Sequence, residues 1–207
     1  MDRDSERGGM MWQPVDTQFF ATYHPVEVAE FGAVSPDGSF TRSLLEQLRA
    51  VVFLHSIGTP GDFLKVLSQG ESAAPYLVIC CHGDDNGLVF GEYIPSIDTS
   101  MLIEGSMPPE CIAAHIKLPG CVVINTACAA GEARMAEAFM KGGLKAYIGT
   151  VEPVPQSEAE PLFIAHFFYK LFRTGCSERE AWEHAASYDA DSRQYVFWDA
   201  EGCHRVG

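Results

Sequence analysis

Three short apolar runs constrain the fold of this chain more than any other feature of its sequence. They are Tyr76–Cys81, Cys121–Thr126 and Ala146–Thr150, and each has a turn before it and a helical pattern after it. Strands that are apolar on both faces belong to parallel sheets that helices cover on both sides. The sequence therefore predicts an α/β fold, a three-layer sandwich with a mainly parallel central sheet.

The segment before these runs predicts one or two strands and a helix. The strands are expected between Thr17 and Val34, where β-branched and aromatic residues are frequent. A helix that ends at Gly58–Gly61 is expected next, because six residues share one helical face: Leu44, Leu45, Leu48, Val51, Val52 and His55.

The segment after these runs predicts two helices and a closing strand. A helix at about Ser157–Phe172 is apolar nearly all round and should be buried. The last helix opens with Ser177 and Glu180, the two halves of a capping box. Gln194–Trp198 is expected to close the sheet as a strand.

Length and composition bound the organisation of the chain. Its 207 residues favour one domain, which we expect at residues 15–207 after a flexible tail at residues 1–14. The chain has 14 Lys and Arg against 28 Asp and Glu, so nucleic acid is excluded as the main partner. No apolar run approaches the ~20 residues that span a bilayer, so no membrane partner is expected. The 7 scattered cysteines are typical of reduced thiols in a cytoplasmic protein.

Two neighbouring strand ends carry residues suited to catalysis. The first apolar run ends before His82 and Gly83, and the second ends before Ala127 and Cys128. Ligands of parallel sheets collect at the carboxyl ends of the strands, and consecutive strands are usually neighbours. A cysteine with a base beside it is the smallest set of residues that can carry out nucleophilic catalysis. The sequence therefore predicts a His82–Cys128 dyad.

The surroundings of the dyad favour this chemistry. We expect Cys128 at the start of a helix, where the positive end of the helix dipole favours a thiolate. Gly83 and Gly87 allow the backbone to turn sharply and to approach a substrate. The amides of Gly83 and Cys128 are then expected to form an oxyanion hole.

These motifs resemble those of the caspase-like cysteine peptidases of clan CD. A strand followed by His-Gly, with Ala-Cys after a second strand 46 positions later, matches the caspase spacing of about 50 residues. Within the clan, the sequence is most similar to the CHAT domain family over roughly Tyr76–Ala186. The likeness includes the run VVINTACAAGEARMAEAFMKGGLKAYIGTVEPV and the later turn Thr174–Ser177. The caspase signature has Gln and Gly where this chain has Thr126 and Ala130, so the resemblance does not imply caspase specificity for Asp.

The resemblance implies a cysteine endopeptidase that acts on protein or peptide substrates without a metal or cofactor. Cys128 would be the nucleophile, and His82 the general base and then the general acid. Peptidases of this kind are typically controlled, and the expected elements fill nearly all of Thr17–Trp198. We therefore expect control in trans by a protein partner or by homo-oligomerisation, acting on the loops Asp84–Pro109 and Glu152–Glu158.

Other interpretations stay open at this stage. The same fold can be a catalytically inactive interaction module, or the dyad can serve a small-molecule amidase. Asp84, Asp85 or Glu152 can form an acidic wall that selects a basic substrate residue, or they can be ordinary loop carboxylates. Cys80 and Cys81 are interpreted as core residues. A zinc site is also conceivable, although its spacing fits no standard pattern, from Cys176, His184, Cys203 and His204.

Overall fold

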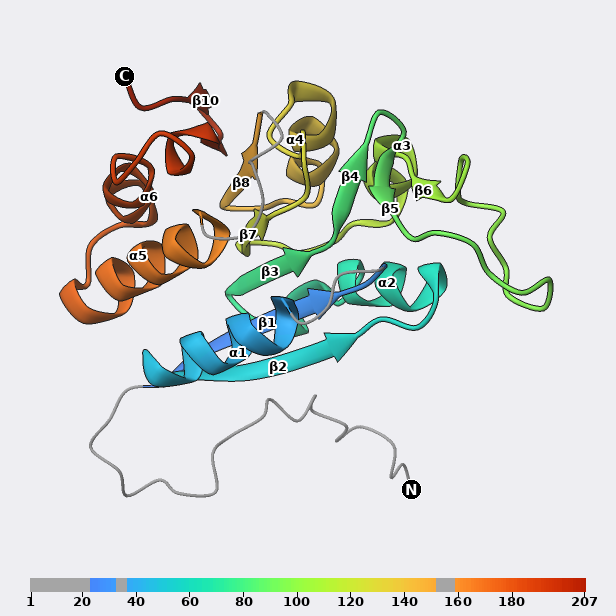
Figure 1. Cartoon of the computed structure of the whole chain (residues 1–207), viewed down its shortest axis with the longest axis horizontal. Coiled ribbons are helices and arrows are strands. Elements are labelled where there is room, and N and C mark those ends of the chain that lie inside the picture. The colour runs from blue at the N-terminus through green and yellow to red at the C-terminus, as the bar shows by residue number, and fades with distance from the viewer. Residues whose placement is uncertain (1–22, 33–36, 152–158) are drawn as a thin grey trace, which may run out of the picture.

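The computed structural model describes residues 23–32, 37–151 and 159–207. Seven strands form the central sheet in the order β10-β9-β8-β7-β3-β1-β2 (Figure 1). Five of them run parallel: β1 (His24–Glu30), β2 (Ala50–Ser56), β3 (Tyr76–Cys80), β7 (Val122–Asn125) and β8 (Ala146–Thr150). The antiparallel strands β9 (Tyr195–Asp199) and β10 (Gly202–His204) complete one edge.

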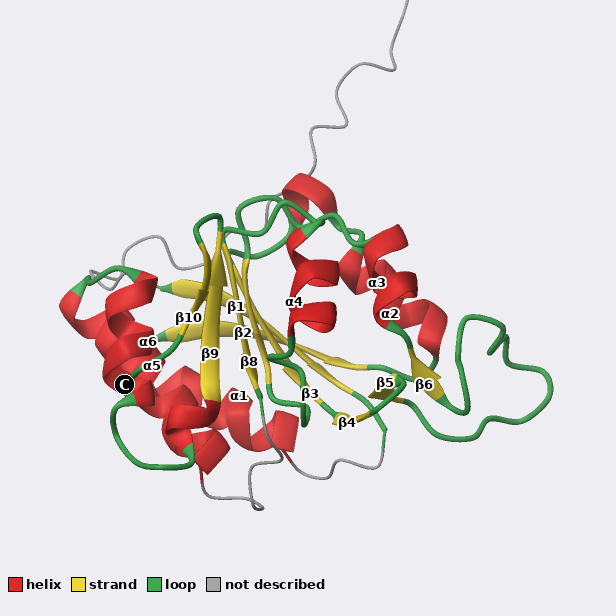
Figure 2. Cartoon of the chain, turned by 90° about the horizontal axis from the view of Figure 1, so that it is seen from above, coloured by secondary structure: helices red, strands yellow, loops and turns green. Residues whose placement is uncertain are grey.

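A second, smaller sheet follows β3 directly. It consists of β4 (His82–Asp84), β5 (Gly87–Val89) and β6 (Ser106–Met107), all antiparallel. Between β5 and β6 a long loop reaches away from the central sheet (Figure 2). His82, the first residue of β4, therefore lies at the junction between the central sheet and the smaller sheet.

Helices cover both faces of the central sheet (Figure 2). One face carries α1 (Asp37–Gln47), α5 (Ala159–Thr174) and α6 (Glu178–Ala186). The other carries α2 (Pro60–Leu67), α3 (Pro109–His115) and α4 (Ala133–Met140). Short 3-10 turns lie at Gly70–Ser72 and Ser192–Gln194. None of the described helices is long and apolar enough to cross a membrane.

The alternation of side chains along β3 shows why its residues are apolar throughout. Val78 and Cys80 pack into the core under α1, α5 and α6, whereas Leu77 and Ile79 pack into the core on the opposite face. All four side chains are buried, as in a strand covered on both sides. The predicted three-layer α/β fold with a mainly parallel sheet is confirmed.

Most of the predicted elements are present with small shifts of their ends. The three apolar runs form β3, β7 and β8, and the closing strand is β9. The capping box of α6 is complete, because Ser177 and Glu180 each bond the other's backbone amide. The expected strand region Thr17–Val34 contains β1. The predicted tail at residues 1–14 lies outside the described residues, as do Ser157 and Glu158 of the expected buried helix.

The predicted helix through Val51, Val52 and His55 is wrong. The helix α1 ends at Gln47, Arg49 takes a left-handed backbone conformation with φ of 70°, and Ala50–Ser56 forms β2. A strand forms here because parallel pairing with β1 over seven residues gives hydrogen-bond partners to the backbone of a segment rich in strand-forming residues. Helical spacing of the apolar side chains was a coincidence of this short segment.

Candidate active site

Cys128 stands in a tight turn that follows β7. The strand ends at Asn125, and α4 begins only at Ala133, so the prediction that Cys128 begins a helix is wrong. The dipole of α4 therefore acts from five residues further along and gives no direct support to a thiolate. The Cys128 side chain is half-buried and is a free thiol.

Side chains from the neighbouring strands hold the backbone of this turn. The amide of Ala127 donates to Asn125 Oδ1 at 3.1 Å. Three further side chains donate to turn carbonyls: Tyr147 to Ala130 at 2.8 Å, Thr150 to Ala127 at 2.9 Å and Trp198 to Gly131 at 3.0 Å. The turn is thus fixed from β7, β8 and β9 together. Sequence reasoning missed these positioning residues, because Tyr147, Thr150 and Trp198 act from other strands of the folded sheet.

The backbone at the top of the turn is strained. Ala129 has a φ of 58°, in the left-handed region that a residue with a β-carbon rarely adopts. Such conformations persist where the surroundings fix them, and they concentrate at functional sites. Within the described residues the amides of Cys128 and Ala129 donate no hydrogen bond. These two donors are therefore available to a ligand.

His82 leaves the same edge of the sheet as Cys128. Strands β3 and β7 are parallel neighbours, with Ile79 opposite Asn125. The pairing continues beyond them, because Thr126 N donates to the Ile79 carbonyl at 3.0 Å. His82 follows β3 after one more residue, and its side chain is exposed.

Gly83 brings the segment after β3 into direct contact with the cysteine turn. A β-carbon at position 83 would overlap the carbonyl oxygen of Cys128 and lie 3.2 Å from the β-carbon of Ala127. Only glycine fits this approach. Gly87, the other glycine predicted to matter, has a φ of 144° and packs against the carbonyl of Met107, so it serves the smaller sheet.

The three predicted acidic residues have different surroundings. Asp84 Oδ1 accepts the amides of Asn86 and Gly87, each at 2.9 Å, and Oδ2 accepts Ser106 Oγ at 2.6 Å. Asp84 therefore organises the β4–β5 turn. Asp85 is exposed, and its carboxylate accepts no hydrogen bond from the described residues. Glu152 lies outside the described residues.

Glu160 is an acidic residue near the site that sequence reasoning missed. It lies in the first turn of α5 and is half-buried. Burial raises the pKa of its carboxyl to about 7, and the negative charge of Asp37 adds to this effect. Its sequence signal is a carboxylate at the start of an apolar helix, two residues after Glu158, and such acidic residues usually mark a helix N-terminus.

Cys80, Cys81 and Cys111 are poorly suited to nucleophilic catalysis. Burial raises the pKa of the Cys80 and Cys81 thiols well above the usual value, in accord with their interpretation as core residues. Cys111 Sγ lies 3.8 Å from His115 Nδ1, but that nitrogen donates to the Cys111 carbonyl at 2.8 Å and is not free to act as a base. Cys203 is exposed on β10.

The conceivable zinc set does not come together in the described part of the chain. His204 instead lies with Asp199 and Glu201 in a group whose ligand atoms are all within 4.8 Å. Arg179 already occupies this group, because its guanidinium contacts Glu201 and His204 Nδ1, each at 3.1 Å. The arrangement is an ion-pair network around an arginine.

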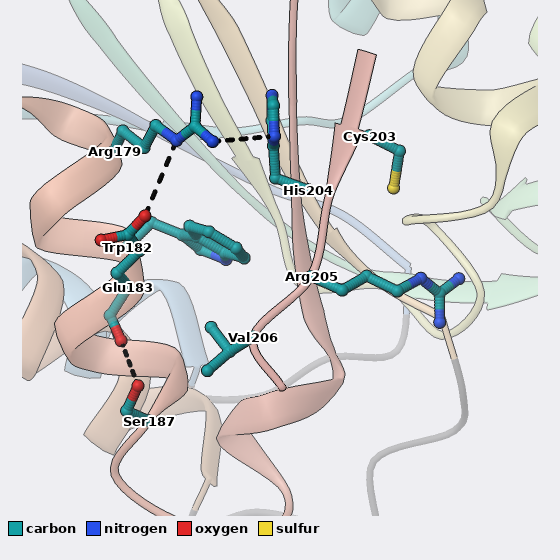
Figure 3. A pocket seen from close by; sticks show the side chains of 8 residues that line it. All are labelled: Arg179, Trp182, Glu183, Ser187, Cys203, His204, Arg205 and Val206. Carbon is teal, nitrogen blue, oxygen red and sulfur yellow. Dashed lines mark hydrogen bonds and ion pairs between the residues drawn. The ribbon is translucent and has the colours of Figure 1, made fainter.

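A cavity of about 460 Å³ lies between α6 and the end of the chain (Figure 3). Its lining includes Arg179, Trp182, His204 and Val206. It adjoins β10, at the antiparallel edge of the sheet and three strands from β7. This cavity is separate from the edge that carries His82 and Cys128.

Comparison with known proteins identifies the fold. Gingipain R, an Arg-specific cysteine proteinase, matches with a TM-score of 0.51 and 12% identity, over 82% of this chain and 43% of its own. The fold is caspase-like. The chain thus spans less than half the length of gingipain R. No family model and no curated protein matches the sequence.

Two other solved structures give weaker superpositions. A secreted C11 cysteine protease from Bacteroides thetaiotaomicron, in complex with an irreversible peptide inhibitor, has a TM-score of 0.47 and 10% identity over 87% of this chain and 67% of its own. drICE has a TM-score of 0.36 and 11% identity over 86% of this chain and 88% of its own. All three neighbours are clan CD cysteine peptidases.

Proposed function

We propose that this caspase-like chain is a cysteine endopeptidase with Cys128 as nucleophile and His82 as general base, and that it belongs to the CHAT family. The observation that carries the proposal is the contact of the His82-Gly83 segment with the Cys128 turn, at the carboxyl ends of two neighbouring strands. A half-buried thiol in a fixed, strained turn, which the segment that begins with the exposed His82 touches through Gly83, suits nucleophilic catalysis.

The chemistry proceeds in two stages. His82 accepts the proton of the Cys128 thiol as the sulfur attacks the carbonyl carbon of the scissile peptide bond. His82 then donates this proton to the leaving amine, and the acyl group stays on sulfur as a thioester. A water molecule, deprotonated by His82, attacks the thioester, and the carboxylic acid leaves as the proton returns to the thiol.

The developing oxyanion is stabilised by backbone amides. The Cys128 amide, which donates no hydrogen bond within the described residues, and the Gly83 amide, carried on the segment that touches the turn, are the proposed donors. A preorganised donor of this kind contributes roughly 3 kcal/mol to transition-state stabilisation. The four side chains that hold the turn keep the Cys128 amide in place.

The substrates are proteins or peptides, and a protein partner or a second copy controls the enzyme in trans. The loop between β5 and β6 supports this proposal, because it protrudes from the smaller sheet and exposes 69% of Ile94 and 49% of Ile103. Its residue Glu104 accepts a hydrogen bond from Asn86 in the β4–β5 turn at 3.3 Å. A partner that orders this loop can thereby influence the strand that begins at His82. The reduced thiols suit a cytoplasmic location.

A cleavage survey tests this function. Wild-type protein and Cys128→Ala are added to separate portions of the same native lysate, which contains cytoplasmic partners, and new protein N-termini are sequenced. We expect new N-termini with a consistent preceding residue in the wild-type sample alone. Identical N-termini in the two samples would exclude a peptidase, and hydrolysis of small amides without protein cleavage would indicate an amidase.

A further inference from the structure

The loop between β5 and β6 (the β5–β6 loop, residues 90–105) has an inner side and an outer side. On the inner side Tyr93, Met101 and Leu102 pack against the core. On the outer side the side chains of Ile94 and Ile103 are exposed to solvent. Apolar side chains on one exposed surface are typical of protein–protein contacts. The outer side of the loop is therefore a surface on which a partner can bury apolar area.

Backbone hydrogen bonds close the base of the β5–β6 loop. The amides of Phe90 and Gly91 both donate to the Gly105 carbonyl, at 2.9 and 3.0 Å. Further along the loop, the Ser100 amide donates to Asp98 Oδ1 at 2.9 Å. Much of the loop conformation is thus fixed before a partner binds, which lowers the entropic cost of docking.

The charges of the β5–β6 loop all have one sign. Glu92, Asp98 and Glu104 are exposed, and the sequence has no Lys or Arg between Lys65 and Lys117. None of the three loop carboxylates forms an ion pair with a described residue. A surface that binds this loop must therefore combine apolar groups with positive charge.

A surface with this chemistry lies on α5 and α6 of the same chain. Five residues form it, and we call them the α5–α6 patch: Leu162, His166, Tyr169, Arg173 and Tyr188. The first four follow one another at helical spacing along one face of α5. The ring of Tyr188, just after α6, has its centroid 4.2 Å from that of His166. The apolar members Leu162, Tyr169 and Tyr188 are 38%, 53% and 55% exposed.

The cations of this surface lack a negative partner. Arg173 and the neighbouring Lys170 form no ion pair with any residue that the structure describes. The acidic residues of α6 are already engaged: Glu178 pairs with Lys145, Glu183 pairs with Arg179, and Glu180 closes the capping box. The α5–α6 patch thus offers exposed rings beside unpaired cations, which complement the β5–β6 loop in charge.

The loop and the patch lie at opposite ends of the molecule. Figures 1 and 2 both place the β5–β6 loop at one end of the longest axis and the helices α5 and α6 at the other. The two surfaces of one chain therefore cannot meet each other. The loop of one copy can instead reach the patch of a second copy.

We propose that the β5–β6 loop of one copy docks on the α5–α6 patch of a second copy. Ile94 and Ile103 then lie against the exposed rings of the patch, and the loop carboxylates pair with Lys170 and Arg173. The contact joins two different surfaces, so each pair of copies keeps one free loop and one free patch. Such a contact continues from copy to copy into a ring or a filament.

This inference deepens the proposed control in trans, and its effect on activity rests on the proposed peptidase function. Glu104 of the loop accepts a hydrogen bond from Asn86 at 3.3 Å, in the turn between β4 and β5. The strand β4 begins at His82. A second copy that holds the loop therefore acts on the segment that carries the proposed general base.

The net charge of −14 is compatible with this contact. At physiological ionic strength, exposed charges more than about 8 Å apart are largely screened from each other. The groups that face one another across the contact therefore decide whether two copies attract. The same net charge disfavours contacts between two acidic surfaces, such as two β5–β6 loops.

Charge reversal tests the inference, with sedimentation velocity over a wide range of protein concentration as the measurement. Every chain carries Cys128→Ala, which prevents self-cleavage by the proposed nucleophile, and this chain is the parent. We expect the parent to associate as its concentration rises. The patch variant Lys170→Glu/Arg173→Glu and the loop variant Glu92→Lys/Glu104→Lys should each associate at least about 10-fold more weakly, because like charges then face each other.

Combining the two variants separates a specific contact from a general effect of charge. A chain with all four reversals again has opposite charges across the contact, so it should associate like the parent. A one-to-one mixture of the loop variant and the patch variant should associate for the same reason.

Matched controls make the same changes elsewhere on the surface. Lys117→Glu/Arg205→Glu alters the net charge as much as the patch variant does, at exposed cations without an ion pair in the described part of the chain, and should leave association unchanged. Ile94→Ser should weaken association. Phe40→Ser, which removes another exposed apolar side chain, on α1, should not.

Three results would overturn the docking contact. The first is a parent that stays monomeric at every concentration. The second is association that neither the loop variant nor the patch variant weakens. The third is association that is lost in both variants and does not return when the four reversals are combined.

Labelling of Cys128 by a peptidyl electrophile separates this inference from the proposed function. In chains that keep Cys128, the labelling rate should rise with concentration in the wild type and stay constant in the patch variant. Association without any labelling of Cys128 would leave the docking contact standing and reject the peptidase. Association with a labelling rate that does not depend on concentration would reject control of the active site by this contact.

Discussion

Gly83 lies with its α-carbon against the carbonyl oxygen of Cys128, so closely that a β-carbon at position 83 would overlap that oxygen. This contact joins the two segments that carry the proposed dyad. It also explains why the residue after His82 has no side chain. The contact is a consequence of sheet topology, because β3 and β7 are parallel neighbours and both segments leave their carboxyl ends.

The contact predicts the effect of Gly83→Ala. The new methyl group must displace the backbone of the Cys128 turn, which the surrounding side chains fix, so we expect a loss of about 1–3 kcal/mol in the free energy of unfolding. Labelling of Cys128 by a peptidyl electrophile should also fall sharply. Gly58→Ala is the matched control, because nothing lies within 4 Å of a β-carbon there. Equal stability and labelling of the two variants in urea unfolding and mass spectrometry would refute the close approach.

The turn itself can be tested through Tyr147. Its hydroxyl donates to the carbonyl of Ala130 at 2.8 Å in a fully buried position, so Tyr147→Phe leaves that carbonyl unsatisfied. We expect a loss of about 1–3 kcal/mol in the free energy of unfolding, measured by urea titration. The exposed Tyr188 provides the control, since Tyr188→Phe should change stability by less than about 0.5 kcal/mol. An unchanged free energy of unfolding in Tyr147→Phe would mean that the turn does not depend on this hydrogen bond.

The two aspartates of the β4–β5 turn should behave differently. Asp84 accepts three hydrogen bonds, two from backbone amides and one from Ser106, whereas the Asp85 side chain accepts none within the described residues. Asp84→Ala should therefore cost about 1–3 kcal/mol of unfolding free energy, and Asp85→Ala about 0.5 kcal/mol or less. Chemical unfolding of both variants measures this, and equal losses would contradict a structural role for Asp84.

Glu160 should make stability depend on pH. Its pKa is raised from 4.5 to about 7 in the folded protein, so folding takes up a proton between these values. The wild type therefore loses stability as the pH rises through this interval, and the full loss is present above about 7. Glu160→Gln carries no such charge and should unfold at a higher urea concentration than wild type at pH 8, with the difference shrinking towards pH 4. A difference that is independent of pH would show that the carboxyl is not perturbed.

The central sheet could be predicted from the sequence because its signals are local. Tyr76–Cys80 and Val122–Asn125 are apolar on both faces, and no other common element accounts for such short runs. The capping box of Ser177 and Glu180 is likewise contained within four residues. The assignment of Ala50–Ser56 failed because helical and strand spacing agree over so short a run, and the pairing with β1 that decides between them is not local.

In the candidate site, too, the residues with local sequence signals could be predicted and those that depend on tertiary contacts could not. His82, Gly83 and Cys128 could be found because each follows a recognisable strand. The turn around Cys128 could not, because Tyr147 and Thr150 hold it from a strand about 20 residues further along the chain. Glu160 could not be found either, since the raised pKa of its carboxyl depends first on burial in the folded chain and then on the charge of Asp37 at the start of α1.

The rate at which Cys128 reacts with a peptidyl electrophile, with and without His82, tests the central claim most directly. Mass spectrometry follows Cys128 in wild type and His82→Ala at pH 7, with the exposed Cys203 of the same molecules as internal reference. The dyad predicts that Cys128 reacts faster than Cys203 in wild type and that His82→Ala lowers the Cys128 rate about 100-fold while leaving Cys203 unchanged. A Cys128 rate equal to that of Cys203 and indifferent to His82 would contradict catalysis and leave the chain an interaction module.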